Sequence, residues 1–182
     1  MAKLIAKSAT EDILPVTVGG LTLSDATPKR LVAIAPWPGS APAAAKALQA
    51  MGLDWPSPDR AAKGAKGVCL WSGRDQAFLA DVAPPPALAE AAALTDLSDG
   101  WVALKLSGPA AAAALARLVA IDLSATAFPE GATARTGLGH MMALVHRSSP
   151  RSFTIYVFRS MAASAAHEIE LAMQSQAARA SA

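Results

Sequence analysis

The chain has 182 residues, of which 53% are hydrophobic and 16% are charged, and its formal net charge is +2. A single cysteine excludes an internal disulfide and a multi-thiolate metal site, and so small a net charge does not indicate a nucleic-acid partner. We expect no membrane span, because no run of about 18 uncharged apolar residues exists, and no signal peptide. The low charge and the mean hydropathy of +0.32 fit either a subunit covered by partners or a bias towards alanine.

Residues 1–28 are polar and lack a clean periodicity, so we expect an N-terminal extended arm that contributes a strand or two. From residue 29 the pattern is sharper, because short apolar runs alternate with Pro- and Gly-rich punctuation. It predicts, in order, a strand at 30–37, a helix that begins near Ser40 and ends at Gly52, a loop at 54–67, two strands within 68–82 and a short helix at 84–94.

The second half repeats this order, and Leu31 in the first half aligns near Trp101 in the second. Its predicted elements are a strand at 100–108, a Pro-started helix at 109–121, a loop, strands at 132–147 and 151–160, and a closing helix at 161–176 with Ser160 as its N-cap.

The expected fold class is therefore α+β, with duplicated βαββα-type units that form antiparallel sheets packed with helices. We expect one domain over residues 29–178, made of pseudo-repeats 29–94 and 95–178. The alternative is that these halves are similar only because many α/β chains can be divided in this way.

Few residues suggest catalysis or metal binding. Cys69 lies in an apolar strand, so we expect a small buried side chain and not a nucleophile. His140 and His146 would lie on one face of one predicted strand, about 20 Å apart, which is too far for a shared metal ion. The stretch 137–139 has two glycines but lacks a third and a following helix, so it predicts a turn or bulge. We expect no catalytic, cofactor-binding or metal site in this chain.

The stretch 135–159 contains four arginines, two histidines and no carboxylate. Its arginines could bind carboxylates or phosphates, serve turns and sheet edges, or pair with acids of another subunit. The missing carboxylate disfavours a hydrolase or transferase site here, because such chemistry needs a general acid or base. The candidate subunit-interface residues are Arg135, His140, His146, Arg147, Arg151 and Arg159.

Three segments, 95–123, 128–147 and 153–172, resemble the gamma subunit of heterotetrameric sarcosine oxidase. The strings D-x-S-D-x-W, S-G-P, F-P-x-G-x-x-x-R-T-x-L-G-H-M and F-R-S occur in the family's order, and a looser similarity extends over 31–172. The resemblance implies a fold similar to the folate-binding domain of the glycine-cleavage aminomethyltransferases.

The resemblance also implies a cytoplasmic complex of alpha, beta, gamma and delta subunits. Such a complex oxidises sarcosine to glycine and hydrogen peroxide and passes formaldehyde to tetrahydrofolate. FAD, FMN and NAD would be bound by the large subunits and zinc by the delta subunit, so this chain would be non-catalytic. The implied partners are the alpha, beta and delta subunits, with no nucleic acid and no membrane.

Two departures from the related families limit this inference. The aminomethyltransferases carry an acidic pair where residues 140–147 read HMMALVHR, and the K-G-C-Y-x-G-Q-E motif of the tRNA-maintenance branch lacks its Gln-Glu after Cys69. Neither chemistry can be assigned to a residue here. The stretch 135–159 is interpreted as the scar of a lost site that now serves docking. The alternatives are a free-standing folate-binding protein whose arginines receive the glutamate tail, the small subunit of a related N-methyl amino acid dehydrogenase, and an adaptor of an unrelated complex.

Overall fold

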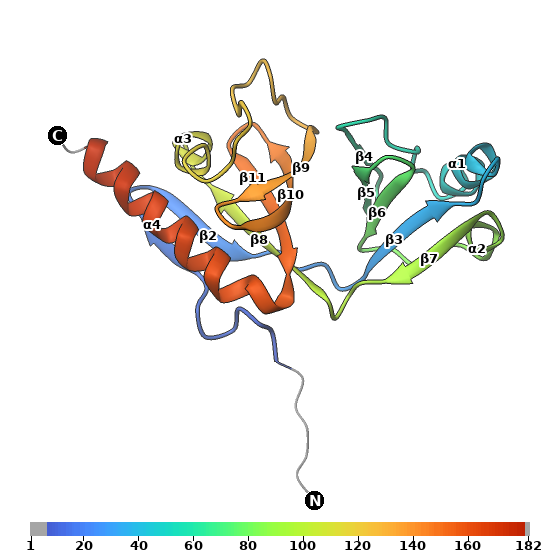
Figure 1. The fold of residues 1–182 in the computed structure, drawn as a ribbon, viewed down its shortest axis with the longest axis horizontal. Coiled ribbons are helices and arrows are strands. Elements are labelled where there is room, and N and C mark those ends of the chain that lie inside the picture. The colour runs from blue at the N-terminus through green and yellow to red at the C-terminus, as the bar shows by residue number, and fades with distance from the viewer. Residues whose placement is uncertain (1–6, 181–182) are drawn as a thin grey trace, which may run out of the picture.

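The computed structural model describes residues 7–180 and contains two antiparallel sheets (Figure 1). The larger sheet has the order β1 (Val16–Val18), β2 (Leu21–Asp25), β8 (Trp101–Ser107), β11 (Ser152–Phe158), β10 (Met141–Ser149) and β9 (Thr133–Leu138). The smaller sheet has the order β4 (Ala61–Lys63), β5 (Val68–Gly73), β6 (Gln76–Ala80), β3 (Leu31–Pro36) and β7 (Ala92–Asp96). The helices are α1 (Ala41–Gln49), α2 (Pro86–Ala91), α3 (Ala111–Leu115) and α4 (Ala162–Ala180), the last preceded by the 3₁₀ turn η1 (Arg159–Met161). The expected α+β class is confirmed.

The two halves repeat the same topology. The series β3-α1-β4-β5-β6-α2 corresponds to β8-α3-β9-β10-β11-α4, and the strand order β4-β5-β6-β3 corresponds to β9-β10-β11-β8. Leu31 and Trp101 begin β3 and β8, as their alignment predicts. Each unit has one strand more than expected, because β4 lies in the predicted loop 54–67 and the predicted strand 132–147 is the hairpin β9–β10. Gly139 allows that hairpin turn, since its φ of +56° is one that other residues rarely adopt.

One strand of each sheet comes from the neighbouring half of the chain. β2 precedes the first unit but pairs with β8 of the second unit, and β7 precedes the second unit but pairs with β3 of the first. The expected boundaries at residues 28 and 94 are therefore wrong. Residues 16–25 are not a separate arm, because Leu21 and Leu23 are buried in the core of the larger sheet. Residues 1–6 of the expected arm lie outside the described residues.

Three apolar clusters define four layers, helices–sheet–sheet–helices (Figure 1). The outer face of the larger sheet packs on α3 and α4, and the outer face of the smaller sheet packs on α1 and α2. The inner faces meet through a third cluster, in which Phe78 of β6 lies edge-to-face with Trp101 of β8 at a centroid distance of 5.1 Å. Burial on both faces explains why the central strands are nearly continuous apolar runs.

Several element ends differ from those expected. α3 covers only 111–115 of the predicted 109–121, and residues 92–94 of the predicted helix 84–94 belong to β7. Ser160 lies within the 3₁₀ turn η1 and is not the N-cap of α4. None of the described helices is both long and apolar enough to cross a membrane.

Candidate functional site

A cleft of about 540 Å³ lies between the two sheets where the inner apolar cluster ends. One wall belongs to the larger sheet and the other to the smaller sheet, chiefly the β4–β5 turn at 63–68. The side chains of most interest in its lining are Lys63, Lys66, Asp81, Lys105, Glu130, His146, Ser148, Thr154 and Tyr156. Its volume falls in the range of about 300–1,000 Å³ that is typical of small-molecule sites.

A polar row crosses the larger sheet at this cleft. His146 of β10 is paired with Thr133 of β9 on one side and with Thr154 of β11 on the other, and Thr154 is paired with Lys105 of β8. Directly paired residues of antiparallel strands project to the same face, so all four side chains belong to the inner face. Thr133 is buried, and its Oγ1 has no hydrogen-bond partner among the described residues.

Backbone hydrogen bonds between the sheets fix one end of the cleft. The amide of Ala61 donates to the carbonyl of Gly131 at 2.8 Å, and the amide of Thr133 donates to the carbonyl of Asp59 at 2.9 Å. An antiparallel bridge between Arg60 and Ala132 lies between these two bonds. The start of β9 is thereby tied to the chain before β4, so the walls keep a defined separation at this end.

The floor of the cleft is uncharged at neutral pH. Burial, assisted by the positive charge of Lys63, lowers the pKa of His146 to about 4. Burial, assisted by the negative charge of Asp81, raises the pKa of Tyr156. Both groups therefore offer neutral hydrogen-bonding atoms, and the charges of the cleft belong to the lysines and to the two carboxylates.

The described residues offer little for covalent or metal chemistry. Among residues 7–180, no group of three or more His, Cys, Asp or Glu side chains could hold a metal ion. Cys69 is fully buried in the cluster between the smaller sheet and its helices, as expected, and burial raises its pKa to about 12. A thiol in that state is a poor nucleophile.

Arg147 follows His146 directly but lies on the opposite face of β10, beneath the loop that precedes β9. It is 7% exposed and donates to the carbonyl oxygens of Leu123, Phe128 and Pro150 at 3.2, 2.8 and 2.7 Å. Its guanidinium carbon also lies 5.2 Å from the ring centroid of Phe153. Of the three roles expected for the arginines, which are anion binding, turn support and pairing with a partner's acids, Arg147 has the second. Its candidacy as an interface residue is wrong, because it is buried within its own chain.

The other candidate interface residues are dispersed. Arg135 lies on β9, Arg151 in the β10–β11 turn and Arg159 at the start of η1, and all three are exposed. His140 is exposed in the β9–β10 turn, just before β10 begins at Met141, so the prediction that it lies in one strand with His146 is wrong. The stretch 135–159 is thus not one site, and its docking role remains a prediction.

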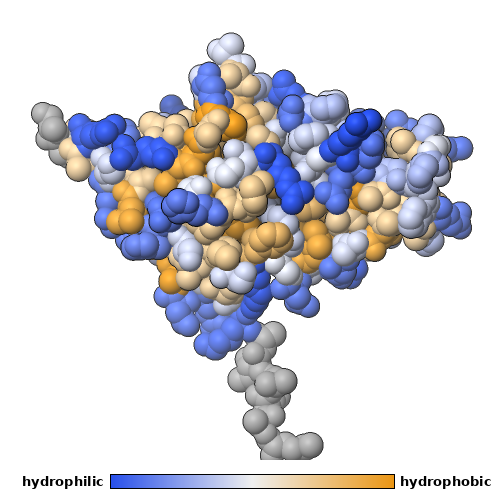
Figure 2. Space-filling model, viewed as in Figure 1, coloured by the Kyte–Doolittle hydropathy of each residue, from blue (hydrophilic) through white to orange (hydrophobic). Residues whose placement is uncertain are grey.

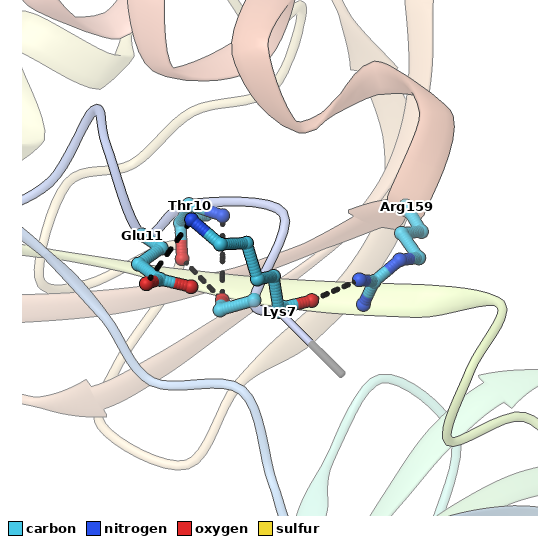
Figure 3. Close-up of polar contacts among 5 residues, drawn as sticks. Lys7, Thr10, Glu11 and Arg159 are labelled. Carbon is cyan, nitrogen blue, oxygen red and sulfur yellow. Dashed lines mark hydrogen bonds and ion pairs between the residues drawn. The ribbon is translucent and has the colours of Figure 1, made fainter. Parts of the chain in front are cut away.

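Arg159 contacts the N-terminal segment. Its guanidinium donates to the carbonyl oxygen of Lys7, whose ammonium lies 3.6 Å from the carboxylate of Glu11 (Figure 3). The N-terminal residues that the structure describes are therefore held against the end of β11. This too is a contact within the chain.

An apolar groove of about 470 Å³ borders the first turns of α4 and holds His140 at its edge. Met142 and Phe158 in this groove are 49% and 44% exposed. Apolar side chains also gather more widely over the face of the molecule on which α4 lies (Figure 2). Exposed apolar side chains that lie together in a groove are typical of interaction surfaces.

The sequence reasoning found His146 but missed the three cleft lysines. Lys63 and Lys66 lie in a segment predicted to be a loop, where exposed lysines are common and do not indicate a site. The only signal for Lys105 is that it interrupts the apolar run of β8 at an inward-facing position. Glu130 and Asp81 lie outside the stretch 135–159 in the sequence, but the fold brings both carboxylates to the cleft that His146 lines.

No protein-family model matches the sequence, and no curated protein matches it. Among solved structures, a chain of the heterotetrameric sarcosine oxidase from Corynebacterium sp. U-96 is 24% identical, with a TM-score of 0.79 and coverage of 93% of this chain and 95% of that chain. This protein shares its fold with that sarcosine oxidase chain. The glycine cleavage system aminomethyltransferase T from Bartonella henselae is 16% identical, with a TM-score of 0.56 and coverage of 82% of this chain but 45% of its own. The expected aminomethyltransferase-like fold is confirmed.

Proposed function

We propose that this chain is the non-catalytic gamma-type subunit of a heterotetrameric sarcosine oxidase. The observation that carries the proposal is the reciprocal coverage of the match, 93% of this chain and 95% of a chain of that oxidase. The chain corresponds to a whole subunit there, whereas it spans only 45% of the aminomethyltransferase. A counterpart of a whole subunit is the better template for a role in an assembly.

Three features of the chain support a structural role. The lone thiol is fully buried, His146 is a weak base because its pKa is about 4, and the described residues lack a metal-binding group. In this proposal FAD, FMN, NAD and zinc belong to the alpha, beta and delta subunits. Those subunits would perform the oxidation of sarcosine and the transfer of formaldehyde to tetrahydrofolate in the cytoplasm. The exposed apolar groove at Met142 and Phe158 would give this chain a docking surface.

The test is co-expression of this chain with alpha, beta and delta subunits, followed by size-exclusion chromatography and a peroxide assay. We expect the chain to elute with the other three subunits, and sarcosine-dependent peroxide to form only with the assembled complex. Sarcosine oxidation by the isolated chain, or failure of the chain to enter the complex, would overturn the proposal. Replacing sarcosine by N-methylglutamate in the same assay distinguishes the related N-methyl amino acid dehydrogenase.

A second candidate function is a free-standing folate-binding module. It is favoured by the fold shared with the aminomethyltransferase and by the polar inter-sheet cleft, although the arginines expected to receive the glutamate tail are not in that cleft. Titration of the isolated chain with tetrahydrofolate decides between the two. Micromolar binding would favour the folate module, and absence of binding at millimolar concentrations would end it.

A further inference from the structure

The cleft gathers three lysines that form no ion pair with an acid among the described residues. Lys63, Lys66 and Lys105 all line the cleft and are exposed to solvent. The ion pairs recorded between residues 7 and 180 are Lys7–Glu11 and Arg74–Asp75, so no cleft lysine takes part in either. Their ammonium groups are available to a ligand.

The two carboxylates of the cleft leave one of the three lysine charges unbalanced. One oxygen of Asp81 already accepts a hydrogen bond of 3.2 Å from the amide of Lys29, outside the cleft lysines. Glu130 supplies the second negative charge. Because His146 and Tyr156 are uncharged at neutral pH, three positive charges face two negative charges, and the cleft has a net formal charge of +1.

The lysines come from opposite walls, so a single ligand can contact both sheets. Lys63 ends β4 and Lys66 lies in the β4–β5 turn of the smaller sheet, whereas Lys105 lies on β8 of the larger sheet. The turn that carries Lys66 is tightly placed, because a Cβ on Gly67 would lie 2.5 Å from the carbonyl oxygen of Ala80. The inter-sheet hydrogen bonds at 59–61 and 131–133 hold the walls in register. The basic groups are thus presented by a fixed frame.

We propose that this cleft binds a small molecule with an anionic end, a carboxylate or a phosphate, and an uncharged hydrogen-bonding head. Lys63, Lys66 and Lys105 bind the anionic end, since ammonium groups form charge-assisted hydrogen bonds with such oxygens. The head lies over His146 and Thr154 of the polar row and beside Tyr156. The site is the cleft that favours the second candidate function, and its argument rests on the cleft lysines and goes beyond the proposed subunit role.

Two probes with these properties test the site and distinguish its possible ligands. N-benzoylglutamate joins an uncharged head to carboxylates, and adenosine monophosphate joins an uncharged head to a phosphate. Each probe is titrated into the full chain by calorimetry. Glutarate and inorganic phosphate, which carry the anionic groups without the uncharged head, are the controls. We expect one of the two probes to bind, and to bind more tightly than its anion alone because the polar row adds contacts. Whichever probe binds identifies the anionic group.

Lysine variants connect that binding to the cleft. Replacing both Lys63 and Lys66 by alanine should weaken the bound probe at least about tenfold, equivalent to about 1.4 kcal/mol. Lys46→Ala is the matched control, because Lys46 lies on α1 at the other side of the smaller sheet, and it should leave binding unchanged. Raising the salt concentration should weaken binding to the wild type more than to the double variant.

Several outcomes would overturn the proposal. The absence of binding by both probes at concentrations up to about 10 mM would contradict it, because the binding free energy would then be weaker than about 3 kcal/mol. Binding that survives the double lysine substitution would place the probe elsewhere. Binding of hexaglutamate alone, lost in the double variant, would identify the cleft as a receptor for an acidic peptide segment. Because the same variants can be tested for entry into the four-subunit complex, failure of this site is separable from failure of the proposed function.

Discussion

Two neighbouring residues of β10, His146 and Arg147, show how differently the two faces of the larger sheet accommodate a basic side chain. His146 faces the inter-sheet cleft, where burial lowers its pKa to about 4 and leaves it neutral. Arg147 faces the opposite side of the sheet, where the carbonyl oxygens of three residues accept hydrogen bonds from its guanidinium. Burial thus disfavours the charged form of His146, whereas the buried guanidinium of Arg147 is provided with hydrogen-bond acceptors.

The difference determines what each residue can do. Arg147 joins the loop before β9 and the β10–β11 turn to the sheet, so its contribution belongs to stability. His146 lies in a cleft open to solvent, so its contribution depends on pH and on whatever enters the cleft. Neighbouring positions in the sequence therefore belong to separate parts of the molecule, and substitutions can separate them experimentally.

The largest effect should come from Arg147→Met, which removes the guanidinium but retains much of the apolar stem. The carbonyl oxygens of Leu123, Phe128 and Pro150 would lose their donor. We expect a loss of about 3 kcal/mol in the free energy of unfolding, since hydrogen bonds to charged groups contribute about 1.5–3 kcal/mol and their buried partners are left unsatisfied. Urea denaturation followed by circular dichroism measures this change.

Arg147→Lys is the matched control for charge. It keeps the positive charge but lacks the planar fork that reaches several carbonyls, so it should be intermediate in stability. A variant Arg147→Met as stable as the wild type would break the comparison, because Arg147 would then be no more important to the fold than an exposed arginine.

The sequence could predict the repeated topology because apolar periodicity, Pro-started helices and Gly-rich turns are local signals. The alignment of Leu31 with Trp101 and the burial of Cys69 followed from such signals. The exchange of β2 and β7 between halves could not be predicted, because a short strand carries no mark of which sheet it joins. For the same reason the sequence predicts that residues 1–28 lie outside the domain, whereas β1 and β2 within them complete its larger sheet.

The site was harder to predict than the fold. The number of basic residues in 135–159 predicts that their side chains form one cluster. Strand alternation and two turns instead direct those side chains to different surfaces. The cleft instead gathers Lys63, Lys105 and Glu130, which are distant in the sequence and become neighbours only through the packing of one sheet on the other. No single segment contains that information.

The second prediction concerns pH and His146. The unfolded state binds a proton at its ordinary pKa of 6.5, whereas the folded state binds it only near pH 4. Stability should therefore be constant above pH 6.5 and fall as the pH decreases towards 4, by up to about 1.4 kcal/mol for each pH unit. His146→Gln, which cannot gain this proton, should remove that loss. Urea denaturation at a series of pH values measures it.

A separate loss is expected at lower pH and serves as an internal reference. Although partial burial alone would raise the pKa of Asp25, hydrogen bonds from Thr10, Thr27 and Ser8 lower it to about 2. Its contribution is present above pH 3.8 and is lost as the pH falls towards 2, in the wild type and in His146→Gln alike. An unchanged loss between pH 6.5 and 4 in the His146 variant would show that the cleft does not suppress this charge.

The third prediction is that the loss of unfolding free energy on substituting Arg159 lies between that for buried Arg147 and that for the exposed arginines. Its guanidinium makes a single described hydrogen bond, to the carbonyl oxygen of Lys7, and the side chain is exposed (Figure 3). Arg159→Ala should therefore cost only about 0.5–1 kcal/mol in unfolding free energy. It should also increase amide hydrogen exchange in residues 8–14 relative to β11, which mass spectrometry can measure. Unchanged exchange there would show that this contact does not hold the N-terminal segment.

The smallest effects on stability should come from Arg135 and Arg151, which are exposed on β9 and in the β10–β11 turn. Their alanine variants should unfold within about 0.5 kcal/mol of the wild type, as exposed substitutions usually do. If these arginines pair with acids of a partner subunit, the same variants should weaken entry into the four-subunit complex, which size-exclusion chromatography of the co-expressed subunits measures. Arg147 cannot answer that question, since its loss disturbs the fold first. Intact assembly in both exposed variants would leave the stretch 135–159 with structural roles and move the docking surface to the apolar groove beside α4.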